Sequence, residues 1–97
     1  MPKAYWVSTY RSITNPDALA AYGKLASPAL TAMGGKFLAR GIPAFAKEEG
    51  LLQRTVLIEF ESVAHAEAAY ASPGYQEALK DLGTGNVVRD IRIIEGA

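Results

Sequence analysis

The segment Arg54-Thr55-Val56-Leu57-Ile58-Glu59-Phe60-Glu61 is the clearest strand in the sequence and decides the fold. Neighbouring side chains of a strand point to opposite faces of the sheet. One face of this strand is apolar and consists of Val56, Ile58 and Phe60. The other face is mixed and consists of Thr55, Leu57, Glu59 and Glu61. We therefore expect helices to cover the first face and to leave the second one bare.

Working outward, three further strands are predicted at 4–10, 36–40 and 87–95, with 44–47 as a candidate continuation of the second. A first helix is predicted from Asn15 and Pro16 to a stop at Gly34-Gly35, because Asn caps helices, Pro suits the first turn and Gly ends them. Pro28 is expected to kink or split this helix near Ser27. Two shorter helices are predicted at 63–71 and 74–82.

The predicted order is strand, helix, strand, strand, helix, strand, with the second helical region in two pieces. This order is typical of the ferredoxin-like βαββαβ arrangement, a four-stranded antiparallel sheet with helices on one face. Ninety-seven residues are too few for two hydrophobic cores. We therefore expect one α+β domain over residues 1–97.

Composition excludes several kinds of protein. Cysteine is absent and His65 is the single histidine, which excludes disulfides, thiolate chemistry and Cys- or His-rich metal sites within one chain. Ten basic and ten acidic side chains cancel and are scattered, whereas nucleic-acid binders carry a basic patch. Residues 1–7 do not have the apolar region typical of a signal peptide, and no segment approaches about 18 consecutive apolar residues. We expect a cytoplasmic protein with no metal, cofactor, nucleic acid or membrane partner.

A second copy of the same chain is the expected partner. A domain this small has a thin stability margin, and without disulfides or metals oligomerisation is the remaining way to widen it. The helix-free face is expected to carry Trp6 and Leu57, and also Arg40 and Glu59, a mixture that a monomer would expose. We expect a homodimer through this face, and a monomer with a mixed face is the alternative.

Three groups of side chains are candidates for chemistry. If the strands place Arg40 opposite Glu59, the pair is either a recognition point for an anion or hydroxyl, or an ion pair that sets strand or dimer register. Tyr22 and Tyr75 occupy helix faces expected to look toward the sheet, where a phenol donates to a ligand or packs its ring. His65 is either a general base or a surface or packing residue.

Several of these residues occur in an order that resembles one family. The stretches are Tyr5-Trp6, Tyr22, Gly34-Gly35-Lys36-Phe37-Leu38-Ala39-Arg40-Gly41, Glu59-Phe60 and Ser72-Pro73-Gly74-Tyr75. They resemble the bacterial domain-of-unknown-function family numbered 1330, within the dimeric α/β-barrel superfamily, over nearly the whole chain. The resemblance implies a ferredoxin-like fold whose two copies pack sheet on sheet, with a cleft between sheet and helices in each.

The resemblance also implies a set of cleft residues, but no established activity. By the family's pattern these are the ligand-binding candidates Tyr22, Arg40, Glu59, Ser72 and Tyr75. The family often has an arginine soon afterwards, where this chain has Leu82-Gly83.

Relatives in the wider superfamily include cofactor-independent monooxygenases, haem-degrading enzymes and small isomerases. We therefore expect a domain that binds a small polar or aromatic metabolite, with an oxygenase or isomerase activity as one form of that function. A non-catalytic homodimeric accessory or stress protein is the alternative. A haem protein with His65 as axial ligand is a third hypothesis.

Overall fold

Strands and helices follow one another in the order βαββααβ in a computed structural model that describes residues 2–97. The strands are β1 (Ala4–Ile13), β2 (Lys36–Gly41), β3 (Thr55–Phe60) and β4 (Val87–Glu95), and the helices are α1 (Pro16–Ala32), α2 (Val63–Ala71) and α3 (Pro73–Leu82). Neighbouring strands are antiparallel and stand in the order β2-β3-β1-β4. The predicted α+β fold with a four-stranded antiparallel sheet is confirmed.

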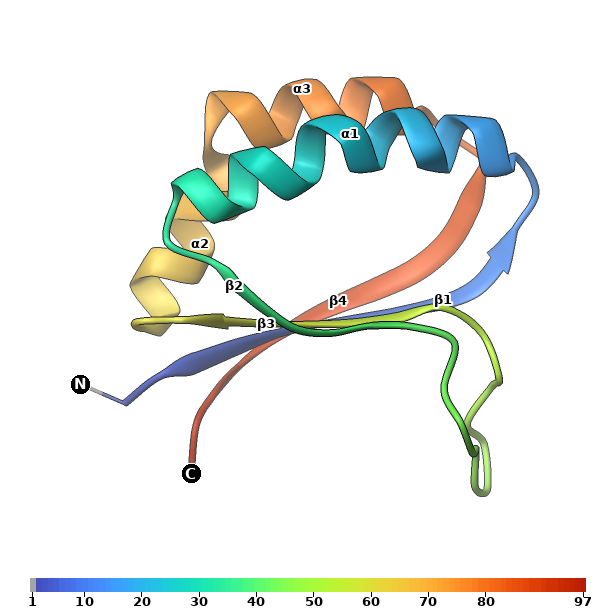
Figure 1. The fold of residues 1–97 in the computed structure, drawn as a ribbon, viewed down its shortest axis with the longest axis horizontal. Coiled ribbons are helices and arrows are strands. Elements are labelled where there is room, and N and C mark those ends of the chain that lie inside the picture. The colour runs from blue at the N-terminus through green and yellow to red at the C-terminus, as the bar shows by residue number, and fades with distance from the viewer. Residues whose placement is uncertain (1) are drawn as a thin grey trace.

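The molecule has two layers, a sheet and a helical layer on one of its faces. Figure 1 shows α1, α2 and α3 on the same side of the sheet, while the segment between β2 and β3 extends to the other side. The core lies between the layers, where the β3 residues Val56, Ile58 and Phe60 are buried as predicted. β1 begins and β4 ends at the same end of the sheet, where Ala4 pairs with Glu95.

Trp6 lies in this core, so its predicted place on the helix-free face was wrong. It stands opposite Ile58 in the β1–β3 ladder, and opposed residues of a ladder share a face. Only 1% of its surface is exposed, and its ring meets those of Phe60 and Tyr75 at centroid distances of 6.1 and 5.2 Å. The helix-free face therefore carries less apolar surface than the sequence suggested.

The helix α1 begins as predicted but does not break at Pro28. Asn15 caps it by accepting a hydrogen bond from the Ala18 backbone N–H at 3.1 Å. The helix then continues through Pro28 to Ala32. Pro28 is exposed, so water can satisfy the carbonyl that lacks its usual N–H donor. The core face of the helix, formed by Tyr22, Ala26 and Leu30, stays in phase across it.

The connection from α1 to β2 depends on two glycines. Gly34 has a φ of +91°, a left-handed conformation that ends the helix with little strain only for glycine. A Cβ on Gly35 would stand 2.9 Å from both the Leu30 carbonyl oxygen and a ring atom of Phe60. The candidate strand at 44–47 is not formed, because β2 ends at Gly41 and the chain leaves the sheet there.

Within residues 2–97, no helix is both long enough and apolar enough to cross a membrane.

Candidate functional site

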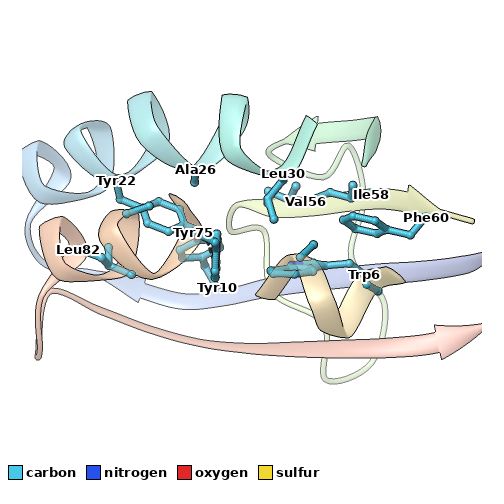
Figure 2. Packing of buried hydrophobic residues seen from close by; sticks show 13 residues of the cluster. Trp6, Tyr10, Tyr22, Ala26, Leu30, Val56, Ile58, Phe60, Tyr75 and Leu82 are labelled. Atoms are coloured by element: carbon cyan, nitrogen blue, oxygen red, sulfur yellow. Dashed lines mark hydrogen bonds between the residues drawn. The ribbon is translucent and has the colours of Figure 1, made fainter. Parts of the chain in front are cut away.

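A half-buried arginine on β4 lies at the centre of three tyrosines. Arg89 Nη1 donates to the hydroxyls of Tyr10 (2.9 Å) and Tyr22 (3.1 Å), and Nη2 donates to the hydroxyl of Tyr75 (3.2 Å). The Tyr22 and Tyr75 hydroxyls are themselves hydrogen-bonded at 2.7 Å. Figure 2 shows the three tyrosine rings together at one end of the core. We call these four residues the Arg89 cluster.

The sheet positions two members of the cluster. Tyr10 and Arg89 are direct partners in the antiparallel β1–β4 ladder, so they share the face that the helices cover. The register shifts between Tyr10 and Ser12, immediately after this pair. An irregularity of this kind bends a strand and re-aims its side chains, and such features are over-represented beside functional sites.

The helices position the other two members. Tyr22 lies on the core face of α1, one turn before Ala26. Tyr75 lies in the first turn of α3, whose start is set by Ser72 at the N-cap. The Ser72 hydroxyl accepts a hydrogen bond from the Tyr75 backbone N–H at 3.4 Å, which orients that first turn. Ser72 thus helps to position Tyr75 through the backbone of α3.

The guanidinium of Arg89 keeps unused hydrogen-bonding capacity. A guanidinium has about five N–H donors, and the phenols accept three of these hydrogen bonds. Nε–H and one N–H of Nη2 have no acceptor among residues 2–97, and no carboxylate there forms an ion pair with Arg89. The positive charge is therefore half-buried against neutral acceptors only.

Burial and proximity shift two pKa values in the cluster. Burial raises the pKa of the Tyr75 phenol, and Tyr22 adds to this effect while the charge of Arg89 opposes it. For Arg89, burial lowers the pKa, but the phenols of Tyr22 and Tyr75 outweigh it and the pKa is raised. At neutral pH Tyr75 is thus a neutral phenol and Arg89 a cation. The cluster can donate hydrogen bonds to an anion, and Tyr75 is unsuited to act as a general base.

Two openings of different character reach Arg89. The first, between α1 and the sheet, is a cavity of about 30 Å³ that we call the α1 cleft. Its polar lining is Ser8, Tyr10, Tyr22, Ser27, Arg40, Arg54 and Arg89. Within residues 2–97, Ser8 Oγ and Arg54 Nε are buried there without a hydrogen-bond partner. A water molecule needs roughly 10–15 Å³ of such space, so the cleft suits one or two waters rather than a metabolite.

The second opening, which we call the β4 hollow, is larger and is lined by fewer side chains. It has a volume of about 440 Å³ and is lined by Tyr70, Arg89, Ile91 and Ile93. Arg89 is the single charged residue of this lining. A larger space of about 670 Å³ lies on the helix-free face, between the sheet and the segment that joins β2 and β3. That space does not reach Arg89, and charged side chains of both signs line it, including Arg11, Asp90 and Arg92.

The pair of Arg40 and Glu59 that the sequence left open is not formed. Arg40 stands opposite Val56 on β3, so it lies on the helix side of the sheet. There it donates to Ser27 Oγ at 3.1 Å and covers the ring of Phe37. The expected place of Arg40 on the helix-free face was wrong because the ladder shifts between Phe37 and Ala39, and this shift moves Arg40 off the face that it would otherwise share with Glu59.

The remaining predicted residues are divided among three places. Tyr22 and Tyr75 meet in the Arg89 cluster. Glu59 lies on the helix-free face, where it accepts a hydrogen bond from the Tyr5 hydroxyl at 3.3 Å. Ser72 is buried at the junction of α2 and α3, and its hydroxyl also donates to the Ala69 carbonyl at 2.7 Å. Neither Glu59 nor Ser72 lines the α1 cleft or the β4 hollow.

His65 is exposed near the start of α2, away from the cluster. Its Nδ1 is 2.7 Å from the hydroxyl of Ser62, which caps the helix. His65 lines neither the α1 cleft nor the β4 hollow. In the part of the chain that the structure describes, no three His, Cys, Asp or Glu side chains are grouped so as to hold a metal ion.

The central residue of the site, Arg89, was missed by the sequence reasoning, as were Tyr10 and Arg54. One signal could have found Arg89: it shares the parity of Ile91 and Ile93, so on a strand it belongs to their apolar face. A charged residue in such a row is unusual and calls for buried acceptors. Arg54 carries no comparable signal, since its place beside Tyr10 depends on how β1 and β3 pair.

Comparison with known proteins identifies a family and a fold. A family model described as "Domain of unknown function (DUF1330)" matches residues 3–97. The sequence has no significant match among curated proteins.

Three solved structures illustrate the similarity of fold. A protein of unknown function from Rhodopseudomonas palustris has a TM-score of 0.70 at 21% identity, over 99% of this chain and 83% of that one. A dimeric ferredoxin-like protein of unknown function from Thermobifida fusca has a TM-score of 0.65 at 14% identity, over 98% and 92%. The cofactor-independent oxygenase SnoaB from Streptomyces nogalater has a TM-score of 0.63 at 13% identity, over 100% and 95%.

Proposed function

The chain belongs to the family described as domain of unknown function DUF1330. For this member we propose that it binds a small organic acid whose carboxylate is held by Arg89. The observation that carries this proposal is the guanidinium at the centre of the Arg89 cluster, half-buried and without an ion-pair partner among residues 2–97. A partly buried cation is costly unless an anion compensates it. A carboxylate matches the planar fork of a guanidinium and can accept two hydrogen bonds from it.

The surroundings of Arg89 favour an anion further. Arg54 and Arg40 line the same α1 cleft, and neither forms an ion pair within the described part of the chain. The guanidiniums of Arg54 and Arg89 both lie within 6 Å of the Tyr10 ring centre, at 5.9 and 5.4 Å. Uncompensated charges of one sign in a cleft with low-dielectric walls raise the local concentration of the opposite ion.

An enzymatic form of this function is the second candidate. Arg89 lines both openings and keeps two N–H groups without an acceptor among residues 2–97, and such donors stabilise negative charge that develops on an enolate or a similar oxygen. SnoaB, a cofactor-independent oxygenase, shares this fold, which supports the candidate at the level of fold alone. The cluster would then supply electrostatic stabilisation, and the substrate or a further group would supply the base.

Self-association through the helix-free face belongs to the same proposal. That face presents Tyr5, Val7 and Leu57 half-buried and Ile94 with 60% of its surface exposed. Next to it, Phe45 of the β2–β3 connection is 81% exposed. A second copy would cover these side chains, and a structural neighbour of the same fold is described as dimeric. In the alternative function this assembly is the whole role of the protein, and Arg89 serves only to satisfy the tyrosines.

Ligand-induced stabilisation tests the proposed function. A panel of small carboxylates, including acetate, benzoate and phenylacetate, is titrated against the protein while the unfolding temperature is recorded. A ligand at a hundredfold excess over its Kd stabilises the native state by about 2.7 kcal/mol. We expect stabilisation in the wild type and in the control Lys80→Gln, which removes an exposed charge on α3. Arg89→Gln is expected to abolish it.

Arg89→Lys separates charge from geometry. Lysine keeps the positive charge but lacks the bidentate fork of the guanidinium. We expect this variant to bind the acids at least tenfold more weakly than the wild type. If no carboxylate stabilises the wild type, or if Arg89→Gln is stabilised equally, the proposed function is wrong and the non-catalytic dimer is favoured.

A further inference from the structure

The β4 hollow identifies the class of acid that would bind, if Arg89 is the carboxylate site proposed above. We infer that the ligand has a flat or chain-like apolar body, as arylacetic and medium-chain acids do. This body lies in the β4 hollow against Ile91, Ile93 and Tyr70, and its carboxylate points to Arg89. Small polar acids lack the apolar part that this surface can bury.

Size separates the two routes to Arg89. The α1 cleft has about 30 Å³ and the β4 hollow about 440 Å³. Pockets that bind small molecules have about 300–1,000 Å³. The β4 hollow falls within that range, and the α1 cleft is smaller by an order of magnitude. The bulk of a metabolite that contacts Arg89 is therefore accommodated on the β4 side.

Apart from Arg89, the residues that line the hollow are Ile91, Ile93 and Tyr70. Ile91 and Ile93 are half-buried members of the row that faces the helices, and they pack against the core cluster. Tyr70 contributes the opposite wall from α2, with 41% of its surface exposed. A hollow with one guanidinium and otherwise aliphatic and aromatic walls matches a molecule with one acid group and an apolar body.

The aromatic wall is held in place before a ligand binds. The Tyr70 ring lies 5.7 Å from that of Trp6 and 5.2 Å from that of Tyr75, measured between centroids. Trp6 and Tyr75 are almost completely buried, so the inner side of Tyr70 rests on rigid neighbours. Ordering this ring therefore costs a ligand little conformational entropy, which favours binding.

Affinity for matched acids tests the inference. Binding of acetate and phenylacetate is measured by NMR titration, since both carry the same carboxylate and only one has a ring. Burying the ring is expected to make phenylacetate bind about tenfold or more tightly than acetate. Chemical shift changes are expected at Ile91, Ile93 and Tyr70. Equal affinities would overturn the inference and leave the carboxylate site on Arg89 intact.

Four variants locate the apolar body. Ile93→Thr keeps a β-branched side chain on the edge strand but removes apolar surface, and Tyr70→Ala removes the aromatic wall. Both should weaken phenylacetate at least threefold and leave acetate unchanged. Tyr70→Phe keeps the ring and should bind like the wild type. Gly23→Leu narrows the α1 cleft, where a Cβ meets nothing within 4 Å, and should also bind like the wild type.

The outcomes distinguish this inference from the function on which it rests. Loss of phenylacetate binding in Gly23→Leu, with Ile93→Thr and Tyr70→Ala unaffected, would place the body in the α1 cleft and overturn the inference alone. Binding that persists in Arg89→Gln, or the absence of binding by either acid, would overturn the proposed function and the inference together. Ile93→Thr is a mild change, so the test holds even if Tyr70→Ala does not fold.

Discussion

Among single residues, Tyr75 connects the members of the Arg89 cluster most closely. Its hydroxyl accepts a hydrogen bond from Arg89 and shares another with Tyr22, and the side chain is completely buried. Tyr22 is buried as well, so water does not readily replace the Tyr75 hydroxyl as its partner. The hydroxyl of Tyr75 therefore contributes to stability as well as to the arrangement of the site.

We expect Tyr75→Phe to lower the free energy of unfolding by about 1–3 kcal/mol, because it leaves buried donors of Tyr22 and Arg89 with one acceptor fewer. Urea unfolding measures the loss, and the m-value should not change. Tyr70→Phe is the matched control, since no hydrogen bond to the Tyr70 hydroxyl is present among residues 2–97, and it should cost less than about 0.5 kcal/mol. Equal costs in the two variants would contradict the role of the cluster.

A second prediction at this scale concerns pH. Thr9 donates a hydrogen bond to Asp90, and this bond, together with Arg92, lowers the pKa of the Asp90 carboxyl below its ordinary value. A carboxyl with a depressed pKa stabilises the native state above the pKa of the unfolded chain, about 3.9. That contribution disappears as the pH falls through the lower pKa of the folded state. Stability should therefore decrease below about pH 4.

Thr9→Val removes the hydrogen bond that contributes most to the lowered pKa of Asp90, and it keeps the shape of the side chain. Unfolding free energies of this variant and of the wild type are compared between pH 2 and pH 6. We expect the difference in unfolding free energy between the two proteins to be present at pH 6 and to become smaller as the pH falls. Lys3 also lowers the pKa of Glu61, but both proteins contain this pair, so its contribution to the pH dependence cancels in the comparison. A gap that does not depend on pH would contradict the assignment.

At the scale of elements, α1 and the turn after it contain two glycines with opposite requirements. Gly23 lies inside the helix, and a Cβ there would meet nothing within 4 Å. Gly35 is buried beside Leu30 and Phe60, where a Cβ would be 2.9 Å from atoms of both. The same substitution should thus have opposite effects at the two positions.

We expect Gly23→Ala to stabilise the protein by about 0.5–1 kcal/mol, because alanine loses less backbone entropy than glycine in a helix. Gly35→Ala should destabilise it by about 1–3 kcal/mol, because the added methyl overpacks the contact between helix and sheet. Thermal or urea unfolding of both variants provides the measurement. Stabilisation by Gly35→Ala would show that β2 can move away from the core without cost.

The whole molecule is asymmetric, with a helical layer on one face of the sheet and none on the other (Figure 1). Trp6 lies on the covered face, so the case for pairing rests on other side chains. These are Leu57 at the middle of the bare face, with Tyr5, Val7 and Ile94 around it. Charged residues adjoin this apolar group, since Glu59 stands opposite Tyr5 and Arg92 stands opposite Val7.

Leu57→Asp tests the proposed assembly. In a dimer through this face the carboxylate would be buried without a partner, so we expect a monomer in light scattering at micromolar concentration. Leu25→Asp is the matched control, because Leu25 is 42% exposed on α1, on the opposite side of the molecule. A wild type that is already monomeric, or a Leu57→Asp variant that stays dimeric, would contradict pairing through this face.

Much of the fold follows from signals that act over a few residues. The caps Asn15, Ser62 and Ser72 start the helices, Gly34 ends the first one, and the alternation in β3 identifies its buried side. Such signals depend on local backbone preferences and on side-chain parity, and both can be determined from the sequence. Pro28 was misjudged because its local cost is offset by the packing of α1 against the sheet and by the exposure of Pro28 itself.

The sequence by itself determined the order and nature of the elements, the apolar face of β3 and the inward direction of Tyr22 and Tyr75. Only the tertiary structure decided which face of β1 the helices cover, which strand residue opposes which, and therefore where Trp6, Arg40 and Arg89 lie. The physical reason is the period of a strand, since a shift of one residue in register moves a side chain to the other face. Arg89 meets Tyr10 across 79 positions of sequence and Tyr22 across 67, so pairing between distant strands creates the site.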